Sequence, residues 1–261
     1  MQFIPIVLFA GFIFWLMYQW RDKKTIVSGP FPTAYREILN QHVSFYQSLS
    51  IDGKASFEKR IMVFLSSIKI TGIHTSIEDI DKVLIASGAL IPVYAFPDWE
   101  YINLHEVLLY PDSFNEKFAI EGNERNVLGM VGSGAMQHVM ILSRPSLRQG
   151  FINHKDKSNT AIHEFVHLID KTDGEVDGIP ESLLNKQYIL PWLAMIHQQI
   201  KEIIAGHSDI NTYGATNQAE FFAVASEYFF ERPDLLQTNH PELYKLLEQV
   251  FRQNPAAGTK L

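Results

Sequence analysis

Two histidines flank a glutamate in the run His163-Glu164-Phe165-Val166-His167, an HExxH pattern. Residues four apart on a helix share one face, so both imidazoles can bind one Zn²⁺ ion at about 2.0–2.1 Å. Glu164, the next position round the helix, can take a proton from a water at the metal and pass it to a leaving amine. The pattern therefore predicts a zinc-dependent peptidase with His163 and His167 as ligands and Glu164 as general base.

The flanking residues favour this interpretation over a chance match. Ionisable groups on a buried helix are expensive unless something pairs them, and here both intervening positions and their neighbours are apolar. Three residues just before the run can cap the start of a helix: Ser158, Asn159 and Thr160. The alternative is a helix whose histidines and glutamate simply face solvent.

A third ligand is expected because catalytic zinc usually has three protein ligands and a water. The stretch 217–230 is apolar except for a few positions, and its Glu220 and Glu227 are seven apart, hence on one face of a helix. Glu220 could bind the metal while Glu227 hydrogen-bonds a ligand histidine from behind. The pattern also fits a capping box of Asn217 with Glu220, and a surface or ion-paired role for Glu227.

Three further features lie at suggestive spacings. Asp170 follows His167 by three residues and could support a ligand histidine, or be a surface aspartate at a helix end. Tyr213, seven residues before Glu220, could stabilise the oxyanion formed at a peptide carbonyl, or be an ordinary loop tyrosine. The apolar run 136–143 could be a sheet edge that pairs with an extended peptide, or part of the sheet core.

The composition of the chain excludes several kinds of site. The chain has 261 residues and no cysteine, which excludes cysteine-ligated metal and a cysteine nucleophile, so a metal would rely on His, Asp and Glu. Its formal net charge of -7, with no long basic run, argues against direct nucleic-acid binding.

The N-terminal residues 3–20 form a segment distinct from the rest of the chain. Residues 3–20 are almost entirely apolar, long enough for a membrane span, with aromatic residues at their end and Arg21, Lys23 and Lys24 directly after. The positive-inside rule then places the rest of the chain in the cytoplasm. A secretory signal peptide or a buried core helix is the alternative. We expect a transmembrane anchor at 1–20, a linker at 21–34, a catalytic domain at 35–255 and a tail at 256–261.

The remaining pattern predicts an α+β fold, mostly helical around a small mixed sheet. Helices are expected at 35–49, 57–70, 77–88, 159–171, 180–206, 216–231 and 241–251. Strands are expected at 106–110, 126–131 and 136–143, and a loop at 144–156.

Several of these segments together resemble the Mlc titration factor A family of zinc peptidases. The resemblance rests on HEFVHLID at 163–170, DGIP at 177–180 and AEFFAVASEYFFERP at 219–233, and extends to LLYPDSF at 108–114 and LSRPSLRQGF at 142–151. It covers roughly residues 30 to 255. The apolar N-terminal run departs from the better-known, soluble members of the family.

The resemblance implies a zincin-like, gluzincin-type site. Ligand roles fall on His163, His167 and Glu220, the base role on Glu164 and a transition-state role on Tyr213. It implies Zn²⁺ as cofactor, a peptide or protein substrate and a transcriptional-regulator partner. The competing functions are a binding protein that captures a transcriptional regulator or another partner, with structural or vestigial zinc, and a chaperone-like, membrane-proximal domain without metal.

Overall fold

The computed structural model describes residues 29–115, 127–132, 134–153 and 156–257. Phe31–Leu261 forms one compact unit, which contains every element discussed below. The expected anchor at 3–20 lies outside the described residues. Within the described ranges, no helix is long and apolar enough to cross a membrane. The anchor, the cytoplasmic placement and the domain boundaries therefore stay predictions.

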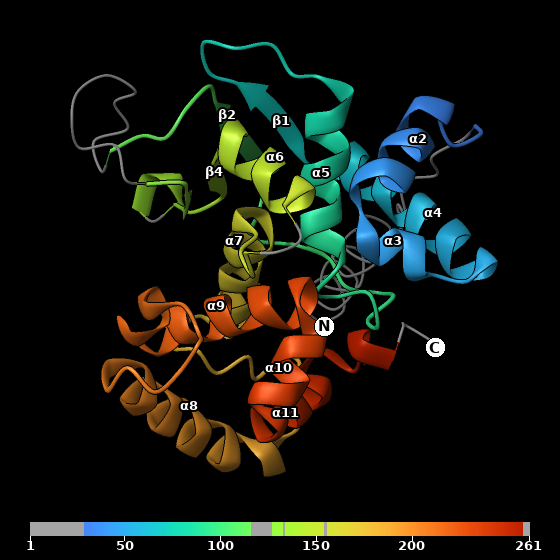
Figure 1. Ribbon diagram of the computed structural model, residues 1–261. Helices are drawn as coiled ribbons and strands as arrows, with labels where there is room; N and C mark the ends of the chain where they lie inside the picture. The colour runs from blue at the N-terminus through green and yellow to red at the C-terminus, as the bar shows by residue number, and fades with distance from the viewer. Residues whose placement is uncertain (1–28, 116–126, 133, 154–155, 258–261) are drawn as a thin grey trace, which may run out of the picture. The chain divides into compact units, whose positions relative to one another are not determined.

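The described unit is a mostly helical α+β domain, which confirms that part of the expected fold (Figure 1). The helices before the site are α2 (Thr33–His42), α3 (Ser44–Ser48), α4 (Ile51–Ser67), α5 (Asp79–Leu90) and α6 (Arg144–Ile152). The helices that build and follow the site are α7 (Thr160–Asp170), α8 (Ile189–Ile204), α9 (Gln218–Glu231), α10 (Pro233–Asn239) and α11 (Pro241–Phe251). The strands are β1 (Lys69–Gly72), β2 (Glu106–Tyr110), β3 (Gly129–Val131) and β4 (Val139–Ser143).

The sheet is mixed, with strand order β1-β2-β4-β3. β1, β2 and β4 are parallel, and β3 runs antiparallel to β4 with Gly129 opposite Leu142. The possibility that 136–143 forms a sheet edge is wrong, because β4 lies between β2 and β3. Its residues Met140, Ile141 and Leu142 are fully buried, which fits a central strand. Among the described strands, β3 and β1 take the two edge positions.

Two of the differences from the expected elements lie beside the sheet. The expected loop after β4 is helix α6, which begins at Arg144 with Pro145 in its first turn, where a missing N–H costs nothing. The expected helix 57–70 ends at Ser67, and the next residues form β1, because Ile68 is extended and Lys69 donates to the His105 carbonyl oxygen.

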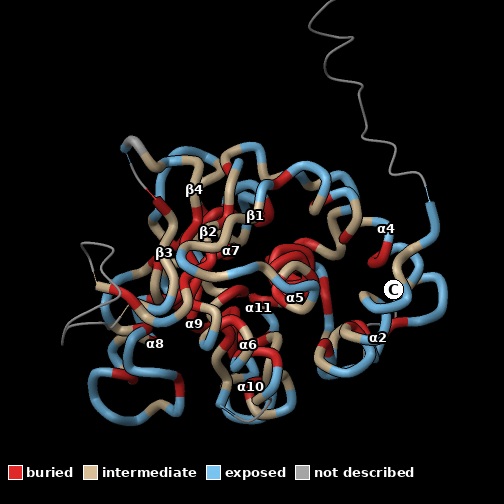
Figure 2. Tube along the Cα trace, turned by 90° about the horizontal axis from the view of Figure 1, so that it is seen from above, coloured by how far each residue is buried: buried red, intermediate tan, exposed pale blue. Residues whose placement is uncertain are grey.

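Helix α7 lies at the centre of the domain. α7 packs against α9 on one side and against α5 and β3 on another. In Figure 2, buried residues are concentrated along α5 and α7. In Figure 1, α8, α10 and α11 lie on the far side of α7 and α9 from the sheet. The HExxH run is thus enclosed on several sides.

Candidate metal centre

Helix α7 carries the HExxH run and is fixed at its start by Asn159. The Asn159 side chain accepts from the Ile162 backbone N–H at 3.2 Å, and Asn159 itself is fully buried. Such a cap stabilises a helix by about 1 kcal/mol. The apolar side chains between the functional residues are fully buried, so the helix is held by packing along its length. These are Ile162, Phe165, Val166 and Ile169.

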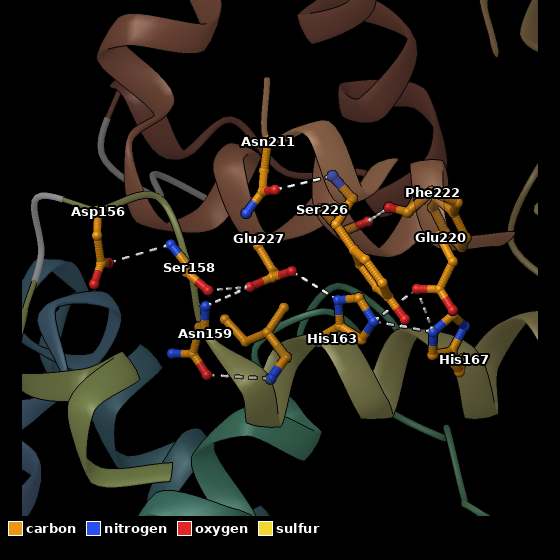
Figure 3. A network of polar contacts seen from close by, with 12 residues as sticks. Asp156, Ser158, Asn159, His163, His167, Asn211, Glu220, Phe222, Ser226 and Glu227 are labelled. Atoms are coloured by element: carbon orange, nitrogen blue, oxygen red, sulfur yellow. Dashed lines mark hydrogen bonds and ion pairs between the residues drawn. The ribbon is translucent and has the colours of Figure 1, made fainter. Parts of the chain in front are cut away.

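Helix α9 supplies the carboxylate. Asn217 caps α9 by accepting from the Glu220 backbone N–H at 2.9 Å. The Glu220 side chain does not fold back to complete a capping box. It turns toward His163 and His167 instead, as Figure 3 shows. The backbone of Glu220 is capped while its carboxylate stays free for the histidines.

Three candidate ligand atoms meet at one point. Nε2 of His163 lies 3.1 Å from Nε2 of His167 and 3.1 Å from Oε2 of Glu220, and His167 Nε2 lies 3.4 Å from the same oxygen. Ligand atoms about 2.0–2.1 Å from one tetrahedral ion are roughly 3.3 Å apart. The two nitrogens and the carboxylate therefore fit a single Zn²⁺ ion, and all three lie within 4.8 Å of one another.

Glu227 holds His163 from behind. Its Oε1 lies 2.7 Å from His163 Nδ1, and its Oε2 accepts from the Ser158 hydroxyl at 2.9 Å and the Asn159 backbone N–H at 2.6 Å (Figure 3). A proton on Nδ1 leaves the Nε2 lone pair for a metal. Glu227 is 5% exposed, so it is neither a surface residue nor idle.

The electrostatics of the cluster are those of a site that attracts positive charge. Burial would raise the pKa of the Glu220 carboxyl, but its hydrogen bonds to His163 and His167 hold that pKa well below its usual range. Burial disfavours charge on His163, yet Glu227 and Glu220 raise its pKa well above the ordinary value. Without a metal, Glu227 and Glu220 favour a proton on His163, and a divalent cation can replace that proton.

Glu164 lies beside this cluster and is 5% exposed. Burial raises the pKa of its carboxyl, and the neighbouring His163 and His167 oppose that rise. A carboxylate with a raised pKa is a better proton acceptor near neutral pH. Its environment therefore suits the expected general base.

Tyr213 lies in a short 3₁₀ turn, Thr212–Ala215, that packs against α9. Asn211 accepts from the Tyr213 backbone N–H at 3.0 Å, and the Tyr213 ring centroid lies 6.1 Å from that of His163. Burial and the charges of Glu220 and Glu164 raise the pKa of its hydroxyl. The hydroxyl stays protonated at neutral pH and can donate.

Asp170 does not hydrogen-bond His167 in this structure. Its Oδ2 accepts from the Gly178 backbone N–H at 2.8 Å, which fixes the loop carrying the DGIP motif. Its Oδ1 and the Nδ1 atom of His167 are both buried without a partner among the described residues. Burial raises the pKa of Asp170 to about 7. The expected support of a ligand histidine by Asp170 stays a prediction.

Asp209 is a connecting residue that the sequence pattern did not reveal. It joins the segment before α7, helix α9 and the α10–α11 junction to the loop that leads to Tyr213. Its carboxylate contacts Lys157 Nζ (2.7 Å), Tyr228 OH (2.7 Å), Asn239 Nδ2 (2.9 Å) and His240 Nε2 (2.7 Å). Four contacts from distant segments leave no trace in local spacing.

Comparisons with known proteins agree with this geometry. The family model described as glucose-regulated metallo-peptidase M90 matches residues 17–252. An uncharacterized protein of Synechocystis is 28% identical over 94% of this chain and 92% of its own length. Mlc titration factor A of Pectobacterium atrosepticum is 30% identical over 70% of this chain and 72% of its own. That of Klebsiella pneumoniae is 27% identical over 92% and 94%. The chain belongs to the glucose-regulated metallo-peptidase M90 family.

Proposed function

We propose that this protein is a zinc-dependent peptidase whose ligands are His163, His167 and Glu220. The observation that carries the proposal is the convergence of two Nε2 atoms and one carboxylate oxygen at separations of 3.1 to 3.4 Å. Those separations fit a tetrahedral ion of zinc's size. The family match supports the reaction class, since its members are described as metallo-peptidases.

The chain's own residues divide the remaining work. A bound Zn²⁺ would supply polarisation of a water and of the scissile carbonyl. Glu164 accepts the proton of the attacking water and delivers it to the leaving amine. The Tyr213 hydroxyl donates to the oxygen that gains charge as the carbonyl is attacked. Glu227 keeps His163 in the tautomer and orientation that a ligand needs.

The substrate would be an extended peptide that lies along β3. Within the described residues β3 is an edge strand, and it packs against α7, the helix of Glu164. An edge strand offers backbone donors and acceptors that a peptide can pair with. This arrangement selects for extended backbone rather than for a particular side chain.

The decisive test is zinc content and cleavage of an unbiased peptide library by wild type and by Glu164→Gln. We expect one zinc per chain in both proteins and a loss of turnover of about 10²–10⁴-fold in the variant. Tyr213→Phe should lower turnover while leaving zinc content unchanged. Full activity of Glu164→Gln, or a wild type that binds no zinc, would overturn the proposal.

A second candidate function is sequestration of a transcriptional regulator, and the name of the relatives, Mlc titration factor A, favours it. The measurement is binding of a purified Mlc-type repressor to wild type and to His163→Ala. Equal binding without metal, together with no peptide cleavage by wild type, would make partner capture the main role.

The membrane anchor is proposed separately. The support is the apolar run 3–20 followed by three basic residues within four positions. We expect the full chain to sediment with membranes, to resist extraction by high salt, and to be released by detergent. A chain lacking residues 3–20 should stay in the supernatant; equal sedimentation of both would contradict the anchor.

A further inference from the structure

Gly129, the first residue of the edge strand β3, lies directly against the side chain of Glu164. A Cβ atom added at position 129 would be 2.6 Å from Glu164 Oε1, 2.7 Å from its Cγ and 2.9 Å from its Cδ. Side-chain carbons in proteins do not approach one another that closely. The strand backbone and the Glu164 side chain can therefore touch in this way only because residue 129 has no side chain.

Backbone conformation gives no reason for a glycine here. Gly129 does not have the positive φ angle that favours glycine, unlike Gly134 or Gly178. A glycine in a strand costs conformational entropy and contributes no packing, and its usual justification is a close approach of another group. At position 129 the approaching group is the carboxylate side chain of the proposed general base.

The atoms that a Cβ would meet determine what a substitution would do. At Gly132 the obstacle is the Met136 backbone carbonyl oxygen, and at Gly178 it is the backbone of Gln218. At Gly129 the three closest atoms all belong to the end of one flexible side chain. The least costly response to a methyl group there is a new position for the Glu164 carboxylate, with the fold left in place.

Among the described residues, no hydrogen bond to the Glu164 carboxylate is found. His163, by contrast, is hydrogen-bonded to Glu227, and Glu220 is held by its contacts to both histidines. Contact with the Gly129 backbone is thus a main restraint on where the carboxylate lies.

We propose that Gly129 is a positioning residue for Glu164: its bare backbone forms the wall that keeps the proton acceptor beside the His163, His167 and Glu220 cluster. Any side chain at 129 displaces that acceptor and leaves the three ligand groups in place. This inference rests on the proposed function for its effect on turnover. The contact itself is independent of that function.

The test uses Gly129→Ala in the full-length protein, with Gly88→Ala as the matched control. A Cβ at Gly88 also meets helix α7 at 2.6 Å, but at Ala161 Cβ, which carries no chemistry. Both variants insert one methyl group against the same helix. For Gly129→Ala we expect unchanged zinc content and KM and a loss of kcat of about a hundredfold, the effect of a misplacement of roughly 1 Å.

Gly88→Ala should lower the melting temperature at least as much, because Ala161 Cβ is fixed to its backbone, and should retain most of the turnover. The proposal is overturned if folded Gly129→Ala retains wild-type kcat. It is also overturned if both variants lose kcat in the same proportion to their loss of melting temperature.

A double-mutant cycle with Glu164→Ala tests the contact without any activity measurement. In the wild-type background Gly129→Ala should lower the melting temperature by a few degrees. In the Glu164→Ala background that loss should disappear, because the methyl group occupies the space the carboxylate has left. Equal losses in both backgrounds would refute the contact. Absence of peptide cleavage by wild type would contradict the proposed function, and the cycle would still decide whether Gly129 restrains Glu164.

Discussion

The two histidines of α7 are supported very differently. His163 Nδ1 is hydrogen-bonded to Oε1 of Glu227. The other carboxylate oxygen of Glu227 accepts from the Ser158 hydroxyl and the Asn159 backbone N–H at the start of α7. One turn later, neither the buried His167 Nδ1 nor the buried Asp170 Oδ1 has a partner within the part of the chain that the structure describes. The His163 end of the site is thus joined to the start of α7 through Glu227, whereas no such link to His167 is found among the described residues.

This difference predicts that the two ends of the site depend differently on the carboxylates beside them. At the His163 end, Glu227 contacts Nδ1 and leaves Nε2 for a metal. At the His167 end, burial raises the pKa of Asp170 to about 7, so an ionised Asp170 carboxyl costs stability. Four substitutions test this comparison.

Glu227→Ala should have the largest effect. The buried Asn159 backbone N–H and the partly buried Ser158 and His163 lose their shared acceptor, so the metal-free protein should lose about 3–5 kcal/mol of unfolding free energy. Zinc affinity should fall by about 10–100-fold as His163 loses its orientation. Urea unfolding and competition with a chelator measure the two effects, with the exposed Glu242→Ala as control. Unchanged zinc affinity would show that His163 needs no support.

Asp170→Asn should act in the opposite direction on the metal-free protein. Because the folded pKa of Asp170 is raised to about 7, the folded state retains a proton that the unfolded chain loses near pH 3.9, so its stability falls as pH rises from about 4 to 7. Asparagine carries no such cost. Chelator-treated Asp170→Asn should be up to about 4 kcal/mol more stable than wild type at pH 8 and similar at pH 4, by urea unfolding.

The same variant should bind zinc more weakly, because the carboxylate that could accept from His167 Nδ1 is gone. A variant that is less stable than wild type at pH 8, or that binds zinc with wild-type affinity, would show that Asp170 serves only to hold Gly178.

Asp209→Asn tests the contacts between the segments that surround the His163 end of the site. Burial would raise the pKa of Asp209, but Lys157, Tyr228 and His240 hold it well below its usual range. Its stabilisation is therefore present above the unfolded pKa and is lost as pH falls toward the folded one. We expect Asp209→Asn to lose about 1–2 kcal/mol of unfolding free energy at pH 7 and less in acid. Urea unfolding at several pH values measures this loss. A pH-independent loss would contradict this account.

Ser158→Ala should have the smallest effect. It removes one of the donors to Glu227 and keeps the Asn159 backbone N–H and His163. We expect about 1 kcal/mol of lost stability and nearly unchanged turnover, measured by urea unfolding and peptide cleavage. A loss as large as that of Glu227→Ala would mean that the hydroxyl, rather than the histidine, is the main partner of Glu227.

The site helices could be predicted from sequence because their starts carry local signals. The expected helices 159–171 and 216–231 agree with α7 and α9 to within two residues, since Asn159 and Asn217 cap them. The placement of Glu220 near the histidines was left open by pattern and came from the family resemblance. Its backbone fits a cap and its side chain faces the histidines, so local pattern alone could not separate the two roles.

The rest depended on contacts between distant segments. Whether β3 or β4 lies at the sheet edge is decided by strand order, which spacing along the chain does not encode. The helix expected from 180 begins at Ile189, because a turn at 181–184 and a 3₁₀ turn at Lys186–Tyr188 follow the DGIP loop. Gly129 carries no functional group, so only the proximity of Glu164 makes it visible.

The distance along the chain between the ligand helices has a consequence for synthesis. α7 ends at Asp170 and α9 ends at Glu231, so a growing polypeptide exposes both imidazoles well before the carboxylate leaves the ribosome. Chains are made at about 5–20 residues per second and their domains fold as units. A nascent chain therefore passes through an interval in which it has two of the three candidate ligands, and a complete metal site can form only once translation has passed α9.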